Sequence, residues 1–402
     1  MRIAYFVHNL ADPAVGKRVR MLASAGDEVH LLGFRRDEKI VDYSGVGVKP
    51  VDLGRTLDRN FAQRAVMVLK RCIGVRAWAE SIRNCDVIMA RNLEMLALAV
   101  ATRRKFAPGA RLVYECLDIH RLLLSKRIWG VVLRAIERTL MRKANLLVIS
   151  APAFMSEYFE PRQGVNHGLR LPVLLVENKV LPALDGIDMP RPVSDPPSGP
   201  PWRIGWFGMI RCRKSLDLLC DLALRHPHLI HLTIRGRPSR VEFENFDAQV
   251  DRAPGISFGG LYDPSELETL YGDVHFNWAI DYFEEDANSS WLLPNRIYEG
   301  GAYNAVPIAL NQTETARWLK AHGIGVVLGS ADRALEAFLL QLTPACYDEL
   351  KQASRAVPRS AFIADDRDSA RLLEALRKAT SSSEQAIASP AGTRSPLIES
   401  AQ

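Results

Sequence analysis

The feature that most constrains the fold of this chain is a regular alternation of short apolar runs with helix-like segments. In the first half, loops and helical segments separate apolar runs at 2–7, 28–34, 86–90, 111–117 and 145–150. Apolar residues between the first two runs recur at helical spacing from Val15 to Ala23, and Gly26 ends that segment. Strand, loop, helix and strand in this order predict a parallel α/β sheet.

The same order starts again after a proline-rich stretch. Six prolines lie between Leu181 and Pro201, which is the composition of a linker. Beyond it, strand-like runs occur at 202–209, 230–234, 256–258, 274–280, 306–310 and 325–328. The chain therefore predicts two Rossmann-like α/β domains, one on each side of the linker. The expected boundaries are 1–180 for the first domain, 181–201 for the linker, 202–360 for the second domain, 361–378 for a last helix and 379–402 for a disordered tail.

Composition narrows the class of protein. A chain of 402 residues suits two domains, and 48% hydrophobic with 24% charged residues is typical of a globular protein. No apolar run approaches the roughly 20 residues that span a bilayer. The six cysteines are scattered without a Cys-x-x-Cys pair, which argues against a structural zinc site and fits a reducing compartment. A cytoplasmic protein is expected.

Charge is distributed unevenly between the two halves. Residues 1–180 hold 30 Lys and Arg against 17 Asp and Glu, a balance of +13, and the remainder holds 22 against 29, a balance of −7. The first half is therefore expected to meet something anionic, with nucleic acid, an anionic membrane surface or a lipid-phosphate acceptor as the candidates. Two helical segments there, 62–80 and 121–143, are both apolar and basic. For each we favour an ordinary amphipathic helix with its apolar stripe in the core, and the alternative is a helix that rests on anionic lipid.

A helix start in the second half has the features of an anion site. Pro294 is expected at the first helical position, where its fixed φ suits the helix. The unpaired N–H groups of such a helix end and its positive dipole suit a diphosphate. Glu299, one to two turns further on, could accept two hydroxyl hydrogen bonds from a ribose. The alternative is an ordinary helix start with a solvated glutamate.

A second anion site is predicted where the first strand of the second half ends. Gly208 lets the backbone approach a phosphate closely, and Lys214 lies six residues further on, just before a helix expected near Ser215. Arg211, Arg213 and Lys214 would supply positive charge. The alternative is a turn with solvated cations. The acidic run 284–286 is interpreted as a solvated loop, and no metal site is predicted.

In the first half, Asp118 and His120 follow the strand-like run 111–117. They form a plausible pair for polarising or deprotonating an acceptor hydroxyl, and His8 is a weaker candidate of the same kind. The alternative for Asp118 is the cap of a helix that begins near Ile119. The sequence lacks G-x-G-x-x-G after its first strand and G-x-x-x-x-G-K-[ST] anywhere, so dinucleotide oxidoreductases and P-loop ATPases are excluded.

These motifs together resemble the GT-B glycosyltransferases, most closely the family-4-like bacterial enzymes that build exopolysaccharide or lipid-linked oligosaccharide. The resemblance covers about 1–378 and depends on the tandem α/β domains, the proline-rich hinge, the spacing from Gly208 to Lys214, and the Asn-Arg-Ile-Tyr-Glu helix. It implies transfer of a sugar from a nucleotide-diphosphate donor of the UDP or GDP type, without cofactor or obligatory metal. The implied acceptor is a hydroxyl of a glycan or lipid-linked molecule. Peripheral contact with an anionic membrane is expected, and binding to nucleic acid is not. The last helix would pack back on the first domain.

The resemblance also assigns residues. Glu299 would bind the ribose, and Gly208, Lys214 and one of Arg211 or Arg213 would hold the donor diphosphate. The backbone around Leu261 and Tyr262 would meet the base, and Asp118 and His120 would face the acceptor and the reacting sugar carbon. The further donor-side residues are Asn295 and Arg296.

The sequence departs from the family pattern at three places. Met209 follows the glycine where the family commonly has arginine, Trp291 stands where the first of two glutamates eight apart is usual, and the path from Glu299 to Pro307 is one residue longer. A nucleotide-sugar epimerase of the same fold and a non-catalytic nucleotide-sugar or membrane-binding module are the alternative functions.

Overall fold

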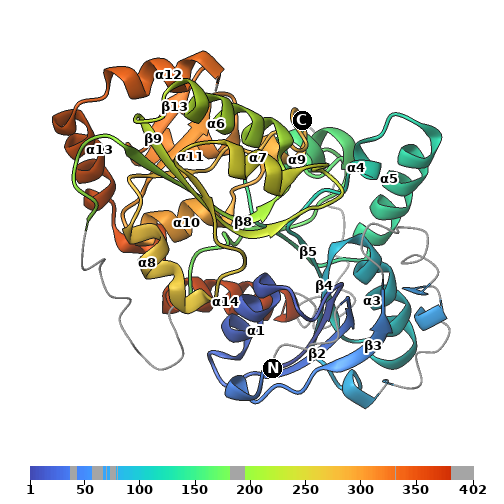
Figure 1. Cartoon of the computed structure of the whole chain (residues 1–402). Coiled ribbons are helices and arrows are strands. Elements are labelled where there is room, and N and C mark those ends of the chain that lie inside the picture. Colours follow the sequence, from blue (N-terminus) through green and yellow to red (C-terminus); the bar gives the residue numbers. More distant parts are fainter. Residues whose placement is uncertain are drawn as a thin grey trace, which may run out of the picture.

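The computed structural model describes residues 1–36, 43–56, 67–68, 70–72, 78, 80–181, 195–330 and 332–381. Two parallel sheets, each packed against helices, form two α/β domains that face one another (Figure 1). The predicted fold class is confirmed. Within the described part of the chain, no helix is both long enough and apolar enough to cross a membrane.

The first domain is built on a sheet of seven strands in the order β3-β2-β1-β4-β5-β6-β7, with every neighbouring pair parallel. The strands are β1 (Arg2–Val7), β2 (Glu28–Arg35), β3 (Val51–Arg55), β4 (Val87–Arg91), β5 (Arg111–Cys116), β6 (Leu146–Ile149) and β7 (Val173–Leu175). The chain order reverses between β1 and β4, and such a switch point opens a crevice at the carboxyl ends of the strands.

Helices connect these strands. They are α1 (Pro13–Ala23), α3 (Asn92–Phe106), α4 (Arg121–Leu124), α5 (Ile128–Met141) and a π-helix at Met155–Gln163. Asp12 caps α1 by accepting a hydrogen bond from the Ala14 N–H at 2.9 Å, and Pro13 follows at the first helical position. The loop between β1 and α1 is thereby fixed at the switch point.

The second domain repeats this plan with six strands in the order β10-β9-β8-β11-β12-β13. The strands are β8 (Trp202–Ile210), β9 (Ile230–Pro238), β10 (Ile256–Phe258), β11 (Phe276–Trp278), β12 (Val306–Leu310) and β13 (Val326–Leu328). Its helices are α6 (Arg213–Arg225), α7 (Phe246–Arg252), α8 (Leu267–Gly272), α9 (Asn288–Trp291), α10 (Asn295–Ala302), α11 (Glu314–His322), α12 (Asp332–Gln341) and α13 (Pro344–Ala356). Here the switch point lies between β8 and β11.

The last helix, α14 (Asp366–Ser381), lies against α1 in the first domain (Figure 1). Leu372, Leu373 and Leu376 are buried there with the apolar side chains of β1 and α1. Immediately before α14 the chain pairs with the end of the first domain, where the Val180 N–H donates to the Phe362 carbonyl at 2.9 Å. Most of the predicted linker and tail lies outside the described residues.

A carboxylate joins the two domains next to this crossing. Glu177 follows β7 in the first domain, and one of its oxygens accepts hydrogen bonds from Tyr298 Oη and Trp318 Nε1, each at 3.0 Å. Tyr298 lies on α10 and Trp318 on α11, so both donors belong to the second domain. The two domains are therefore hydrogen-bonded to each other at this point.

Helix α5 contradicts the favoured interpretation of segment 121–143. Ile128, Trp129 and Ile136 lie on the exposed face of the helix. The inward face carries buried Gly130, Glu137 and Met141, and Leu133 and Leu140 pack against the core from the same side. Glu137 accepts hydrogen bonds from Tyr114 Oη at 2.7 Å and from Tyr158 Oη. A buried polar network thus holds this helix with most of its apolar residues exposed. The other such segment, 62–80, lies largely outside the described residues.

Candidate functional site

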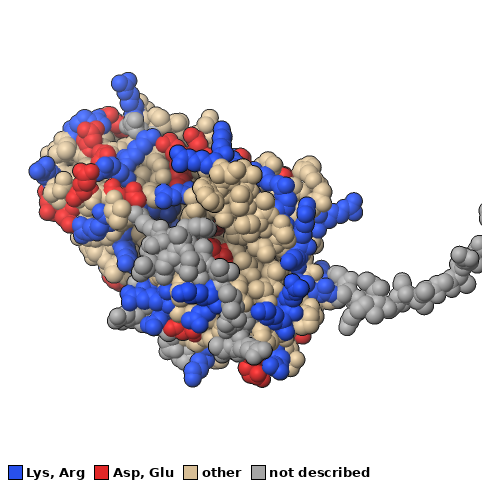
Figure 2. Space-filling view, turned by 90° about the vertical axis from the view of Figure 1, so that its right-hand side faces the viewer, with Lys and Arg blue, Asp and Glu red and all other residues tan. Residues whose placement is uncertain are grey.

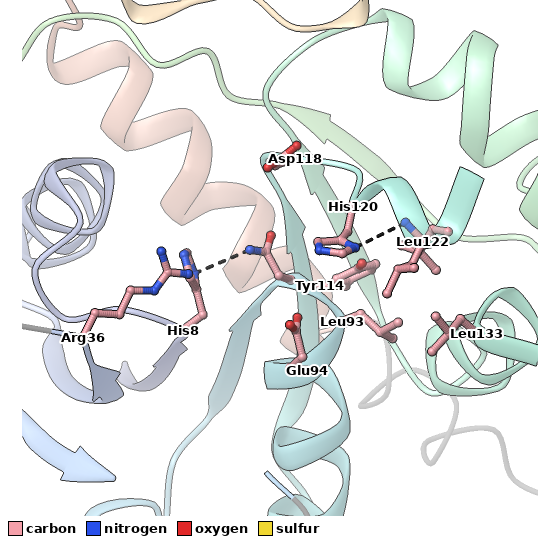
Figure 3. A pocket seen from close by; sticks show the side chains of 11 residues that line it. His8, Arg36, Leu93, Glu94, Tyr114, Asp118, His120, Leu122 and Leu133 are labelled. Carbon is pink, nitrogen blue, oxygen red and sulfur yellow. Dashed lines mark hydrogen bonds between the residues drawn. The ribbon is translucent and has the colours of Figure 1, made fainter. Parts of the chain in front are cut away.

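The two domains face one another across a cleft, where Glu157 of the first domain and Lys214 of the second line a hollow of about 420 Å³. The first domain contains a smaller cavity of about 100 Å³. It lies where β1, β4 and β5 end, at the switch point of the sheet (Figure 3). The lining residues on the side nearest the second domain are Asp118 and His120, with His8 opposite them. Burial lowers the pKa of His8 to about 4, so its ring is neutral near pH 7. The structure places Asp118 and His120 side by side along the same cavity, at the carboxyl edge of the sheet.

Asp118 also contacts the second domain. Its Oδ1 accepts a hydrogen bond from the side-chain amide of Asn288, and the Asn288 carbonyl oxygen in turn accepts from the Ile119 N–H at 3.1 Å. Asp118 is exposed, but the protein around its carboxylate desolvates it and raises its pKa, and Arg211 and His120 partly offset this effect. The alternative role of Asp118 as a helix cap is wrong, since α4 begins at Arg121. Asn288 was not predicted, because nothing in its sequence neighbourhood indicates a partner 170 residues away.

His120 is the residue that caps α4. Its Nδ1 accepts a hydrogen bond from the Leu122 N–H at 3.3 Å (Figure 3). A neutral imidazole that accepts at Nδ1 carries its proton on Nε2. With Nδ1 used as an acceptor, Nε2 is the ring nitrogen through which His120 can carry a proton.

A buried ionic cluster supports the loops around this cavity. Glu115, at the end of β5, accepts hydrogen bonds from Arg18 Nε at 2.6 Å, from Arg91 Nε at 2.9 Å and from Tyr5 Oη. All four side chains are almost wholly buried. Burial alone would raise the pKa of Glu115, but the two guanidinium groups hold it at about 2. Arg91 also reaches Asp12 at 3.4 Å, so the cluster ties β1, β4 and β5 to α1.

On the side of the second domain, two neighbouring strands carry paired glycines. Gly208 on β8 has φ of +107°, and no atom lies within 4 Å of where its Cβ would be. Gly236 on β9 pairs with it and has φ of +134°, and a Cβ there would lie 1.8 Å from the Gly208 carbonyl oxygen. Only glycine fits at Gly236, so the two strand ends present bare backbone. The sequence analysis identified Gly208 and missed Gly236.

Two of the three predicted cations face the cleft. Arg211 pairs with Asp281 at 3.1 Å, and its charge reaches Asp118 across the cleft. Lys214, in the first turn of α6, pairs with Glu285 at 3.4 Å and lies over the Tyr282 ring. These partners show that the acidic run is not merely a solvated loop.

Arg213 does not join them. It pairs with Glu244 at 3.7 Å and lines a surface hollow beside α6 and α7 with Asp217 and Phe243. Of the two arginines between which the resemblance left a choice, the structure brings Arg211 to the cleft. Helix α6 also begins at Arg213, two residues earlier than expected.

Glu299 lies on α10 and faces the first domain. It is partly buried, and desolvation raises its pKa, while Lys17 of α1 and a hydrogen bond from Tyr271 Oη at 3.3 Å act in the opposite direction. The expected carboxylate is therefore at the cleft and has a cation from the other domain close by. Helix α10 begins at Asn295, and Pro294 is its extended N-cap, one residue from the predicted position.

Two of the remaining donor-side residues, Tyr262 and Arg296, lie near Glu299. The Tyr262 hydroxyl is close enough for the charge of Glu299 to raise the pKa of Tyr262, although burial is the larger cause. Arg296 donates to the Trp278 carbonyl at 3.1 Å and acts electrostatically on Glu299 and on Asp281. The Leu261 carbonyl accepts from Arg235 at 2.9 Å, and its side chain is exposed.

Where the family pattern has its first glutamate, the structure has buried Trp291 in α9. A carboxylate is nevertheless present nearby. Glu284 is half-buried, and burial together with the charge of Asp118 raises its pKa, while Arg211 lowers it. Glu284 thus lies among the charged groups of both domains, a placement that the run of three acidic residues did not indicate.

The chain resembles known proteins in sequence and in fold. No protein-family model matches the sequence. The succinoglycan biosynthesis protein ExoL of Rhizobium meliloti (strain 1021) is 44% identical over 393 residues, which are 96% of each chain.

Solved structures share the fold at low sequence identity. Sucrose-phosphate synthase from Thermosynechococcus elongatus superposes with a TM-score of 0.69 at 14% identity, over 94% of this chain and 98% of that one. Anabaena Alr3699/HepE in complex with UDP and glucose gives 0.63 at 14%, over 94% and 100%. The apo lipopolysaccharide outer core galactosyltransferase WaaB gives 0.60 at 14%, over 94% and 99%. The predicted GT-B architecture is confirmed, and the chain belongs to the family of the succinoglycan biosynthesis protein ExoL.

Proposed function

We propose that the protein is a glycosyltransferase that moves a hexosyl group from a nucleotide-diphosphate sugar to a hydroxyl acceptor in polysaccharide biosynthesis. One observation carries the proposal. Asp118 of the first domain lies within electrostatic reach of Arg211 of the second, at the point where the carboxyl ends of both sheets face each other. An acceptor held at the first and a diphosphate held at the second would meet there.

The donor is assigned to the second domain. Glu299 suits the ribose diol, with Tyr262 and the backbone of Leu261 toward the base. Asn295 and Arg296, at the start of α10, complete the donor side, because the helix N-terminus favours an anion. Uracil is the base we favour, since the structural neighbour HepE was solved with UDP-glucose.

Positive charge on the donor side would stabilise the leaving group. During transfer, negative charge builds up on the diphosphate. Arg211, Lys214 and the exposed backbone at Gly208 would stabilise this charge. The ion pair of Lys214 with Glu285 is half-exposed on both sides. Such pairs contribute about 0–1 kcal/mol, so an incoming diphosphate can displace the carboxylate at little cost. We propose a metal-independent reaction, because these fixed cations already supply the charge that a metal would bring.

The acceptor would enter the cavity of the first domain. The Nε2–H of His120 would hold a sugar or phosphate oxygen, and Asp118, whose pKa is raised, would orient the acceptor hydroxyl and accept its hydrogen bond. We expect a glycan or lipid-linked acceptor. We also place the protein in the cytoplasm, in contact with an anionic membrane.

A matched pair of variants tests this proposal. Lys214→Ala removes a cation from the cleft, and we expect kcat for transfer to fall about 10²–10³-fold, which corresponds to about 2.7–4 kcal/mol of transition-state stabilisation. Arg213→Ala removes the neighbouring cation, which faces away, and should leave kcat within about twofold.

The assay follows sugar transfer from UDP-sugars to membrane extract or glycan acceptors. Equal rates for Lys214→Ala and wild type would refute the donor assignment. Isomerised sugar formed without an acceptor would instead indicate an epimerase.

A further inference from the structure

The outward face of α5 is apolar to a degree unusual for a surface helix. Ile128 and Trp129 are each 72% exposed, and Val131, Val132 and Ile136 are 51%, 42% and 46% exposed. Ile128, Val132 and Ile136 follow each other at intervals of four, so they form one stripe along the helix. These five exposed residues are called the α5 face below, and α5 itself lies at the outer edge of the molecule (Figure 1).

Cations border the α5 face. The exposed basic residues on and beside the helix are Lys126, Arg127, Arg138, Arg142 and Lys143. The acidic residue within α5 is Glu137, and it is fully buried against Tyr114 and Tyr158. Figure 2 looks onto this side of the molecule and shows an uncharged area with Lys and Arg gathered along its border.

The orientation of the helix is fixed. Gly130 lies against the preceding loop so closely that a Cβ there would be 2.1 Å from the Ser125 carbonyl oxygen. Arg134 donates to the carbonyl oxygens of Leu123 and Ser125 at 2.6 and 2.8 Å. Together with buried Glu137 on the inward side, these contacts prevent the helix from turning the α5 face into the core.

A second copy of the chain is a poor occupant for this face. In a twofold-symmetric dimer the same patch meets itself, so the bordering cations of one copy would lie against those of the other. An anionic lipid surface complements both parts of the face at once. Its acyl region accepts the apolar stripe, and its headgroups pair with the cations.

We propose that the α5 face seats the protein on an anionic membrane, with the helix lying in the headgroup region. The seating also serves the acceptor, and this part rests on the proposed function. Leu133, on the inward side of α5, lines the same cavity as Asp118 and His120 (Figure 3). The sugar or phosphate headgroup of a lipid-linked acceptor would therefore reach the cavity while its acyl chain stays in the bilayer.

Vesicle flotation of the full chain tests the seating without donor or acceptor. We expect the protein to float with phosphatidylcholine vesicles that contain about 30 mol% phosphatidylglycerol and to bind pure phosphatidylcholine at least about tenfold more weakly. Trp129→Ser with Ile136→Ser should lower vesicle affinity at least about tenfold. Leu224→Ser with Leu340→Ser, at similarly exposed apolar positions of α6 and α12, is the matched control and should float like wild type.

The cations are tested separately. Arg127→Ala with Arg142→Ala should weaken binding by about fivefold for each cation removed, and salt at about 0.5 M should act in the same direction. Quenching by lipids with brominated acyl chains reports insertion of the helix, and Trp129→Phe should abolish the part of that quenching that arises from the α5 face.

Several outcomes would overturn the seating. They are a wild-type chain that stays in solution with anionic vesicles, a Trp129→Ser/Ile136→Ser variant that floats unchanged, or that same variant converting a dimer to a monomer in the absence of lipid. A rise in Tm on addition of UDP is measured in parallel. Its absence alongside normal flotation would refute the proposed function and leave the membrane contact standing.

Discussion

The ionic cluster around Glu115 gives a quantitative prediction about stability and pH. The carboxyl is buried between Arg18 and Arg91, which hold its pKa at about 2 against an ordinary value of 4.5. Because the pKa is depressed in the folded state, the stabilisation is fully present above about pH 4.5. It is lost as the pH falls toward 2, where the folded chain also takes up the proton.

The size of the effect follows from the shift. A difference of about 2.5 units corresponds to about 3 kcal/mol at neutral pH, and about 2 kcal/mol of this is lost by pH 3. Glu115→Gln removes the titrating group and leaves two buried guanidinium groups without its charge. Breaking a buried pair in this way costs about 3–5 kcal/mol at pH 7. The gap in unfolding free energy between wild type and variant should therefore shrink by about 2 kcal/mol on going from pH 7 to pH 3.

Urea unfolding of both proteins at a series of pH values measures this gap, and the comparison cancels the titration of all other carboxyls. Tyr5→Phe is the milder companion, because it removes one hydrogen bond to Glu115 and should cost about 1 kcal/mol. A gap that stays constant from pH 7 to pH 3, or that widens, would refute the assignment of a depressed pKa to Glu115.

Three further predictions concern the cleft. The affinity for UDP should fall as the pH drops through the raised pKa of Glu299, and Glu299→Gln should abolish this dependence while weakening binding about tenfold; isothermal titration at several pH values would measure both. Lys17→Met removes the cation that lowers the pKa of Glu299, so the midpoint of the pH dependence of UDP affinity should move to higher pH. An unchanged midpoint would disprove the coupling between Lys17 and Glu299. Asn288→Ala leaves Asp118 without the amide that bridges the domains, and kcat for transfer should fall about tenfold or more with little change in Tm. A loss confined to Tm would assign Asn288 a structural role.

The sequence predicted the elements whose signal is local. Both runs of strands, the switch from linker to β8, and the glycine and lysine around the start of α6 depend on residues a few positions apart. β3 was missed because Val51–Arg55 is a short edge strand with a glycine inside it and one buried residue. The helix starts predicted at Pro294 and Ser215 lie one and two residues from the observed starts at Asn295 and Arg213. Such shifts are expected because helix ends depend on capping contacts.

The site was predictable one domain at a time. Gly208, Lys214 and Glu299 each follow a local rule for binding anions or diols. Asn288 and Lys17 act on a residue of the opposite domain, and no spacing along the chain encodes such a contact. The choice between Arg211, which precedes α6, and Arg213, its first residue, depended on the direction of each side chain. Arg211 pairs with Asp281 and Arg213 with Glu244, and the sequence does not indicate either pair.

Helix α5 shows a different limit. Its periodic apolar residues are those of an ordinary core helix, and periodicity alone does not say which face turns inward. Glu137 contained the signal, because a carboxylate opposite an apolar stripe can be the buried side if Tyr114, Tyr158 and Gln163 supply its hydrogen bonds. Those donors come from a strand and from the π-helix, so the three-dimensional fold was needed to find them.

The position of α14 has a practical consequence for anyone who wishes to study the halves separately. Asp27 binds both the chain's amino group and Arg377, so the beginning of the polypeptide and its last helix are parts of one folding unit. A fragment that stops at the hinge would expose the groove that Leu372, Leu373 and Leu376 fill, and it should aggregate. Grafting 366–381 behind 1–180 through a flexible tether should restore a well-behaved half-molecule. The reciprocal fragment, 195–365, should tolerate the loss of that helix.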